Sequence, residues 1–232
     1  MNETVRLVRR AKAGAPVRAA APRKEPSRTN DPERTQANIL QVAEAEFGEK
    51  GLAGARIDAI AEATKTSKRM IYYYFGSKEG LYLAVLEEAY RRVRDVEAEL
   101  HLQDLEPEEA LRRLVAFTFD HHLHHESYIR LVMSENIHRG EYLAQSPRIQ
   151  ELNVPAIAAI RNLVERGVKA GVFRKGLDAV DIHASISALS FFNVSNRHTF
   201  GLIFKLDMQS PAYIAQRRDN VVEMIVRFVR KL

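Results

Sequence analysis

The sequence predicts an all-α protein, with an N-terminal helix-turn-helix head of three helices followed by a larger C-terminal helical domain. Apolar residues recur at spacings of three and four along the chain, and capping residues precede several of these runs. No stretch has the strict apolar/polar alternation of a half-buried strand, and we find no internal repeat or G-x-G-x-x-G loop. Helices are therefore expected from residue 31 onward.

Composition narrows the class of protein. The 232 residues are 46% hydrophobic, which allows one large domain or two smaller ones with a sizeable core. The absence of cysteine excludes disulfides and thiolate chemistry and suits a reducing cytoplasm. No run approaches the roughly 18 consecutive apolar residues of a membrane span. We therefore expect a cytoplasmic protein that has no membrane partner.

Residues 1–30 carry the excess positive charge. Eight Lys and Arg against two Glu give this segment +6, whereas the rest of the chain sums to −1. The segment is rich in Ala, Pro and Arg and has no long periodic apolar face, which predicts a disordered basic arm. It is either a solvated tail or an arm that follows DNA phosphates through counterion release.

Residues 31–76 are the predicted head. Asp31-Pro32-Glu33 is a typical helix start, and Gly51 suits the end of that helix. A second, short helix runs from Ile57 to about Ala63, and a turn of small and polar residues follows. Ser67 can cap a third helix that reaches about Phe75 and ends at Gly76.

The residues expected on the outer face of the third helix are unusual for a solvated surface. Lys68 and Arg69 occupy its first turn, where such helices meet base edges, and both side chains can contact guanine or phosphate. Tyrosine hydroxyls can donate to phosphate. Lys78 lies beside the next helix N-terminus, which attracts anions. The full set of expected DNA contacts is Arg56, Thr66, Ser67, Lys68, Arg69, Tyr72, Tyr74 and Lys78.

The run KTSKRMIYYYFGSKEGLY resembles the recognition helix and linker of the TetR family of bacterial transcriptional repressors. The matching residues are Tyr72, Tyr73, Tyr74, Phe75, Ser77, Lys78 and Glu79. The resemblance covers about residues 33–90 and implies a dimer that binds operator DNA and is released by a small-molecule effector. Arg56 departs from a common threonine. Gly80 stands where a capping-box glutamate would strengthen the next helix, so a weak helix start is expected there.

Residues 77–232 are the predicted effector-binding and dimerisation domain. A long helix from Ser77 towards Leu100 would link it to the head. Further helices are expected over 107–125, 127–138, from Pro147 to near Gly171 (one kinked helix or two pieces), over 178–196 and over 211–232, with a loop at 197–209. The last two helices have wide apolar stripes. The resemblance implies that they form a four-helix bundle in a homodimer; the alternative is packing within one chain.

The ligand-binding candidates are mixed apolar and polar residues of the C-terminal domain. Phe117, His121, Met133 and Asn136 could surround a cavity between the middle helices, because pockets are mostly apolar with a few placed polar groups. Phe192 and Asn196, near a helix end, could line a ligand pocket or a dimer interface. No cofactor is predicted.

The run from His121 to Glu126 supports a second hypothesis. His121 and His125 lie four apart on one helix face, a spacing that can bind a metal, but a third ligand must come from elsewhere. The chain could therefore be a helical metal-binding protein or enzyme, although no nucleophile elbow is present and no metal site is favoured. A third hypothesis is an architectural DNA binder without an effector. The favoured hypothesis is the ligand-responsive dimeric repressor, with the helix after Ser77 as its lever.

Overall fold

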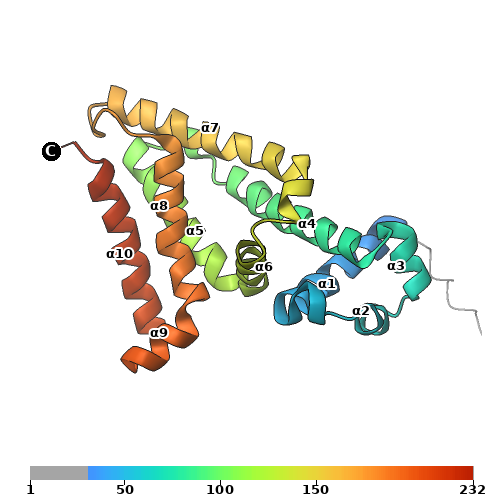
Figure 1. The fold of residues 1–232 in the computed structure, drawn as a ribbon. Helices are drawn as coiled ribbons and strands as arrows, with labels where there is room; N and C mark the ends of the chain where they lie inside the picture. Colours follow the sequence, from blue (N-terminus) through green and yellow to red (C-terminus); the bar gives the residue numbers. More distant parts are fainter. Residues whose placement is uncertain (1–30, 232) are drawn as a thin grey trace, which may run out of the picture. The chain divides into compact units, whose positions relative to one another are not determined.

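A computed structural model describes residues 31–231, and its helices follow the order that the sequence predicts (Figure 1). The predicted basic arm, residues 1–30, lies outside the described residues. The helices are α1 (Pro32–Gly54), α2 (Ile57–Ala63), α3 (Lys68–Phe75), α4 (Lys78–Ala98), α5 (Pro107–His124), α6 (Glu126–Ile137), α7 (Pro147–Lys169), α8 (Ala179–Ser195), α9 (Arg197–Phe204) and α10 (Pro211–Val229). Within this range none is long and apolar enough to cross a membrane.

Side-chain caps explain where several helices begin. The hydroxyl of Ser67 accepts a hydrogen bond from the backbone N–H of Met70 at 3.2 Å, and that of Ser77 accepts one from Gly80 at 2.9 Å. Ser146 caps α7 in the same way. These bonds satisfy N–H groups that have no partner inside the helix. The starts predicted after Ser67, at Ser77 and at Pro147 are confirmed.

One open alternative is resolved, and one prediction is wrong. Residues 147–169 form a single helix with Pro155 inside it. The loop predicted at 197–209 is wrong, because α9 occupies its first half. No side chain caps α9, but Arg197 is buried in an ion pair with Glu126 at 2.5 Å, and the Phe200 ring contacts Phe192 and Phe204. Tertiary contacts therefore stabilise a helix that carries no local start signal.

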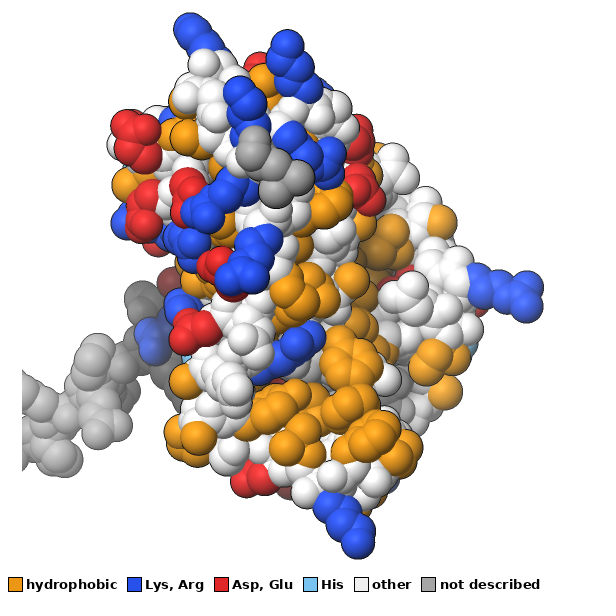
Figure 2. Space-filling model, turned by 90° about the vertical axis from the view of Figure 1, so that its left-hand side faces the viewer, with side chains coloured by type: hydrophobic (Ala, Val, Ile, Leu, Met, Phe, Trp, Pro, Cys, Tyr) orange, Lys and Arg blue, Asp and Glu red, His pale blue; other side chains and the backbone are white. Residues whose placement is uncertain are grey.

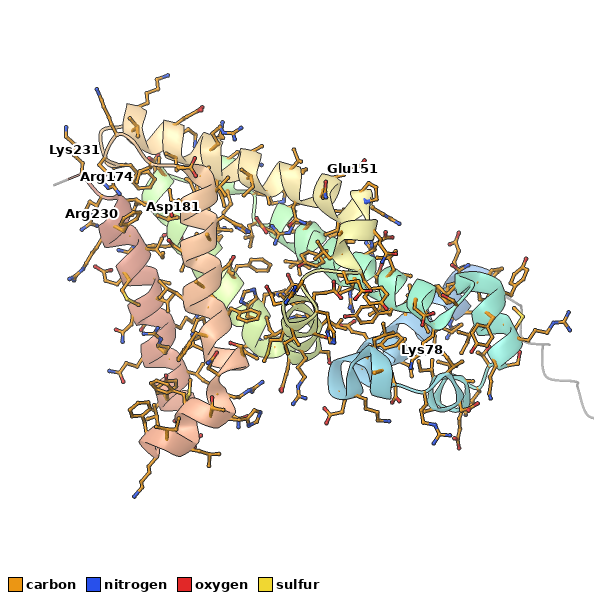
Figure 3. All side chains as sticks on the ribbon, viewed as in Figure 1. Lys78, Glu151, Arg174, Asp181, Arg230 and Lys231 are labelled. Atoms are coloured by element: carbon orange, nitrogen blue, oxygen red, sulfur yellow. The ribbon has the colours of Figure 1, made fainter. Side chains whose placement is uncertain are left out.

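The last predicted helix ends three residues early. After Val229 the backbone turns extended, and Arg230 forms an isolated antiparallel bridge with Phe173. Arg174 contributes to this junction: its Nε donates to the Phe228 carbonyl at 2.8 Å, and its guanidinium lies over the Phe228 ring. Figure 3 labels Arg174, Arg230 and Lys231 together at this end of α10. The bridge fixes the end of α10 against the loop before α8.

Two hydrophobic cores organise the described helices. One contains α1, α2, α3 and the first half of α4, with Leu131 of α6 and Ile149 of α7. The other joins α5, α7, α8 and α10. Because α4 and α6 contribute to the core of the head and continue towards the second core, the two halves are connected by packed helices and not by a loose linker.

A buried carboxylate joins α4 to α6. Tyr82 donates its hydroxyl proton to Glu135 Oε1 at 2.9 Å, and the backbone N–H of Leu143 donates to Oε2 at 2.9 Å. The Tyr82 ring also meets Phe47 of α1 edge-on, at 5.1 Å between centroids. Glu135 is only 3% exposed. A shift of α6 would therefore disturb both α4 and α1.

Candidate DNA-binding head and ligand cavity

The helix-turn-helix is built on three isoleucines. Ile57 and Ile60 of α2 and Ile71 of α3 are buried and hold the two short helices together. The turn between them uses the left-handed conformation at Lys65, where φ is 53°. The Thr64 hydroxyl donates to the Ile60 carbonyl at 2.7 Å and closes the end of α2. With this packing inside, the opposite side of α3 is left exposed.

Lys68, Arg69 and Tyr72 are all exposed at the start of α3, as expected. Lys68 forms an ion pair with Asp58 of α2, and the Arg56 guanidinium lies 3.9 Å from the same carboxylate. No carboxylate within residues 31–231 lies within 4 Å of Arg69 in an ion pair. The head thus presents one cation restrained by an acid and one cation without such a partner.

The outward position expected for Tyr74 is wrong. Tyr74 is half-buried and packs against the core of the head, whereas Tyr73 is 77% exposed. Tyr74 lies three residues after the buried Ile71 and therefore shares its helix face. The sequence spacing already contained this signal.

Three other expected DNA contacts are partly buried or already hydrogen-bonded within the protein. Thr66 is half-buried, and the Ser67 hydroxyl is engaged in the cap. Lys78 donates from Nζ to the Ala53 carbonyl at 3.3 Å, which ties the start of α4 to the end of α1 (Figure 3). Lys78 is therefore half-buried and partly structural.

Gly80 is not simply a weak helix start. A Cβ at this position would lie 2.1 Å from the carbonyl oxygen of Phe75. Real carbon–oxygen contacts are much longer, so any side chain would separate α3 from α4. Glycine is therefore required by this close approach, and the expected loss of a capping-box glutamate has a steric reason.

A cavity of about 210 Å³ lies among α4, α5, α6, α7 and α8. It is lined by Tyr90, Val93, Arg94, Glu97, Leu114, Phe117, Thr118, His121, His122, Tyr128, Val132, Asn153, His183, Ile186, Ser187 and Phe191. Of the residues expected to bind ligand, Phe117 and His121 line this cavity.

The other four candidate ligand residues do not line it. Met133 is half-buried next to the lining residue Val132, and Asn136 is exposed and donates to its own helix at the Val132 carbonyl. Phe192 packs on Phe200, with ring centroids 5.2 Å apart, and Asn196 is exposed. Val132 and Phe191 line the cavity in place of their predicted neighbours Met133 and Phe192. The apolar spacing alone did not show which of the two adjacent residues faces the cavity.

The cavity contains a buried ion pair that the sequence did not single out. Arg94 Nη1 lies 2.7 Å from Glu97 Oε2, and the two side chains are 15% and 9% exposed. Burial raises the pKa of Glu97, and the neighbouring Arg94 opposes that rise. An Arg and a Glu three apart on a helix usually form a surface pair, so only the fold reveals that this pair faces a cavity.

Three histidines of the cavity are uncharged at neutral pH. Burial, reinforced by nearby cationic groups, lowers the pKa of His121 to about 3 and that of His122 to about 4. Burial and Arg94 lower the pKa of His183 in the same direction. Desolvation disfavours the charged imidazole, so each ring offers one donor nitrogen and one acceptor nitrogen.

The histidine run does not form a recognisable metal centre. The rings of His121 and His125 stack at 4.1 Å, and His125 Nδ1 lies 2.8 Å from the His121 carbonyl oxygen. His124 Nδ1 is engaged in the same way with Asp120. Across residues 31–231 no three His, Cys, Asp or Glu side chains gather in a way that could hold a metal ion. The geometry does not favour the metal-binding hypothesis.

Two family models match the chain. The model for bacterial regulatory proteins of the tetR family matches residues 39–85, and the model for the tetracyclin repressor-like C-terminal domain matches residues 107–225, about half of the chain. The chain belongs to the TetR family. It is a DNA-binding, ligand-responsive transcriptional regulator and not an enzyme.

Similar proteins of the TetR family are named as repressors. The transcriptional repressor NicS of Pseudomonas putida is 34% identical over 209 residues, which cover 90% of this chain and 99% of NicS. The repressor SCO4008 of Streptomyces coelicolor is 36% identical over 139 residues, or 60% of this chain and 69% of SCO4008.

Solved structures agree on the TetR fold. The regulator SCO4942 of Streptomyces coelicolor has a TM-score of 0.62 at 25% identity, and covers 84% of this chain and 98% of its own. The ketosteroid regulator KstR2 of Mycobacterium tuberculosis has a TM-score of 0.63 at 20% identity, with 88% and 98% covered. At that identity the second comparison supports the fold alone.

Proposed function

We propose that this TetR-family regulator is a repressor that binds a pseudo-palindromic operator as a homodimer and is released when a small molecule enters the cavity. The observation that carries the proposal is the capped α3, whose first turn exposes Lys68 and Arg69 while Ile71 anchors it to α2. The names of the most similar proteins support repression. A protein that acts on chromosomal operators would work in the cytoplasm.

The proposed DNA contacts divide by chemistry. Lys68 and Arg69 would contact base edges or phosphates from the first turn of α3. Tyr72, and the more exposed Tyr73, would donate to phosphates and fix the register. Arg56, Thr66, Ser67 and Lys78 surround this turn and would add backbone contacts, although Ser67 and Lys78 also serve the fold.

The proposed dimer uses α8 and α10, which keep apolar side chains at the surface. Val180 is 55% exposed, and Met224 and Phe228 of α10 are more than 40% exposed. Figure 2 faces this side and shows hydrophobic side chains gathered over its lower half, where α9 joins α8 to α10, with Lys and Arg above; Val180 and Phe228 lie at the other ends of their helices. Exposed apolar patches of this kind are typical of interaction surfaces.

The proposed release mechanism runs through α4 and α6. Tyr90, Val93 and Arg94 of α4 line the cavity, and the same helix supplies Leu81 and Tyr82 to the core of the head. On α6, Tyr128 and Val132 line the cavity, and Glu135 binds Tyr82. A ligand would release DNA only by binding the non-operator conformation more tightly.

The test is selection of DNA fragments by the purified protein. We expect enrichment of one sequence with two related half-sites, since a symmetric dimer places two heads on successive grooves. Failure to enrich any sequence, with the protein folded, would overturn the proposal. Enrichment of a single half-site without symmetry would overturn its dimeric part.

A further inference from the structure

The guanidinium of Arg94 has hydrogen-bonding capacity that the protein does not use. Arg94 lines the cavity and its Nη1 forms an ion pair with Glu97 at 2.7 Å, but its buried Nε has no hydrogen-bond partner among the described residues. Buried donors without acceptors are costly. The unmet demand is therefore for an acceptor, and beside a guanidinium the best acceptor is an anion.

Two histidines add uncharged polar groups to the same cavity. His121 and His122 are 8% and 7% exposed, and the Nδ1 atom of each is buried without a partner. Both rings are neutral for the reason given above, so they can exchange hydrogen bonds with a polar ligand but cannot balance a second negative charge. Arg94 is the sole guanidinium or ammonium group among the described lining residues. Glu97, the sole carboxylate among those lining residues, offsets this charge, so a ligand can bring at most one negative charge, in exchange for the Glu97 carboxylate.

The rest of the lining favours a flat ring. Phe117 and Phe191 contribute apolar faces, and Tyr90 and Tyr128 meet edge-on at 5.5 Å between centroids. A cavity of roughly 150 Å³ accepts benzene in another protein, and this cavity has about 210 Å³. It therefore has room for one six-membered ring with one or two short substituents.

We propose that the cavity binds a monocyclic aromatic monocarboxylate, with the carboxylate on Arg94 and the ring between Phe117 and Phe191. This inference rests on the proposed function, in which the cavity is the effector site. Glu97 is the resident counter-ion with which the ligand carboxylate competes. A hydroxyl or ring nitrogen on the far side of the ligand would meet His121 and His122.

The proposal is tested by calorimetric titration of the full chain with three probes of one shape: benzoate, benzamide and benzylamine. We expect benzoate to bind about tenfold more tightly than benzamide, because hydrogen bonds between charged partners exceed neutral ones. Benzylamine, which would need Glu97, should bind more weakly than either.

Variants of Arg94 and Glu97 test whether this ion pair causes the preference for benzoate over benzamide. Arg94→Gln should abolish the preference for acid over amide, and the double variant R94Q/E97Q should do the same without leaving a buried charge unpaired. E97Q removes the competing carboxylate and should tighten benzoate binding. Arg91→Gln is the matched control, because Arg91 lies one turn earlier on α4, pairs with Glu88 at 2.6 Å and does not line the cavity.

Three results would overturn the ligand class. They are benzamide binding as tightly as benzoate, a benzoate preference that survives in the folded R94Q/E97Q protein, and no binding of any probe. The selection of operator DNA is a separate readout. A protein that selects an operator but fails this titration retains the proposed function and loses only the carboxylate assignment.

Discussion

At the scale of single residues, the two cations of the recognition helix are not equivalent. Lys68 is held by Asp58, and Arg69 has no such restraint among the described ion pairs. We expect Lys68→Ala and Arg69→Ala each to weaken operator binding by about 1–3 kcal/mol if they contact bases. Tyr72→Phe should cost less, since it removes one hydroxyl.

Gel-shift titration measures these changes. Arg113→Ala is the control, because this exposed arginine of α5 pairs with Glu109 away from the head. Unchanged affinity in all three head variants would contradict the assignment of α3 as the DNA-reading helix.

Asp58 gives the second prediction at this scale. Its carboxylate is 49% exposed and neutralises Lys68 while lying 3.9 Å from Arg56. Asp58→Asn should tighten binding to operator and to unrelated DNA alike and steepen its salt dependence, because more positive charge then faces the phosphates. Asp95→Asn, an exposed partner of Arg91 on α4, should change neither quantity. Weaker binding of Asp58→Asn would show instead that the acid positions Lys68.

The buried histidines give a prediction in pH. Because the pKa of His122 falls from 6.5 in the unfolded chain to about 4 in the fold, the unfolded state binds protons more readily between these values. Above pH 6.5 the His122 ring is neutral in both states and its titration does not change stability, and as the pH falls from 6.5 towards 4 it costs stability progressively. His122→Gln should reduce the loss of Tm over this range, whereas exposed His124→Gln should not. Parallel Tm curves for wild type and His122→Gln would refute the assigned cause.

At the scale of helices, the junction of α3 with α4 depends on the missing side chain of Gly80. Gly80→Ala should destabilise the protein by about 1–3 kcal/mol, as overpacked sites do, because its Cβ would lie 2.1 Å from the Phe75 carbonyl. Gly54→Ala is the control, since its Cβ meets only Lys50 Cβ at 3.3 Å. Chemical denaturation measures both, and equal stability of the two variants would exclude the steric account.

The helices also show what sequence can and cannot predict. Caps and apolar spacing are local, so the starts at Ser67, Ser77 and Ser146 could be predicted. The helix α9 could not, because it depends on Arg197 reaching Glu126, which lies 71 positions earlier in the chain.

The candidate cavity was predictable only in part, for the same physical reason. Phe117 and His121 lie on a helix face whose burial is visible in its periodicity. Arg94 and Glu97 look like a solvated pair until the packing of α5 and α7 on α4 encloses them. The sequence predicted the long helix α4 as a lever. The structure also places two of its polar residues, Arg94 and Glu97, in the lining of the cavity.

At the scale of the whole molecule, function requires two heads, and the apolar surface of α10 is where we expect a second copy to pack. Met224 lies on α10 and is 41% exposed. Met224→Glu would place a charge in the proposed interface without a partner, which is strongly unfavourable once desolvated. The variant should sediment as a monomer at concentrations at which the wild type is a dimer.

The same variant should lose operator affinity although its head is untouched, because each head then binds a half-site without the contribution of its partner. Val154→Glu is the matched control: Val154 is 67% exposed on α7 and outside the proposed interface. A Met224→Glu protein that remains dimeric would exclude this part of α10 from the interface. A monomer with full operator affinity would instead separate dimerisation from DNA binding, and the two-headed mechanism of release would then fail.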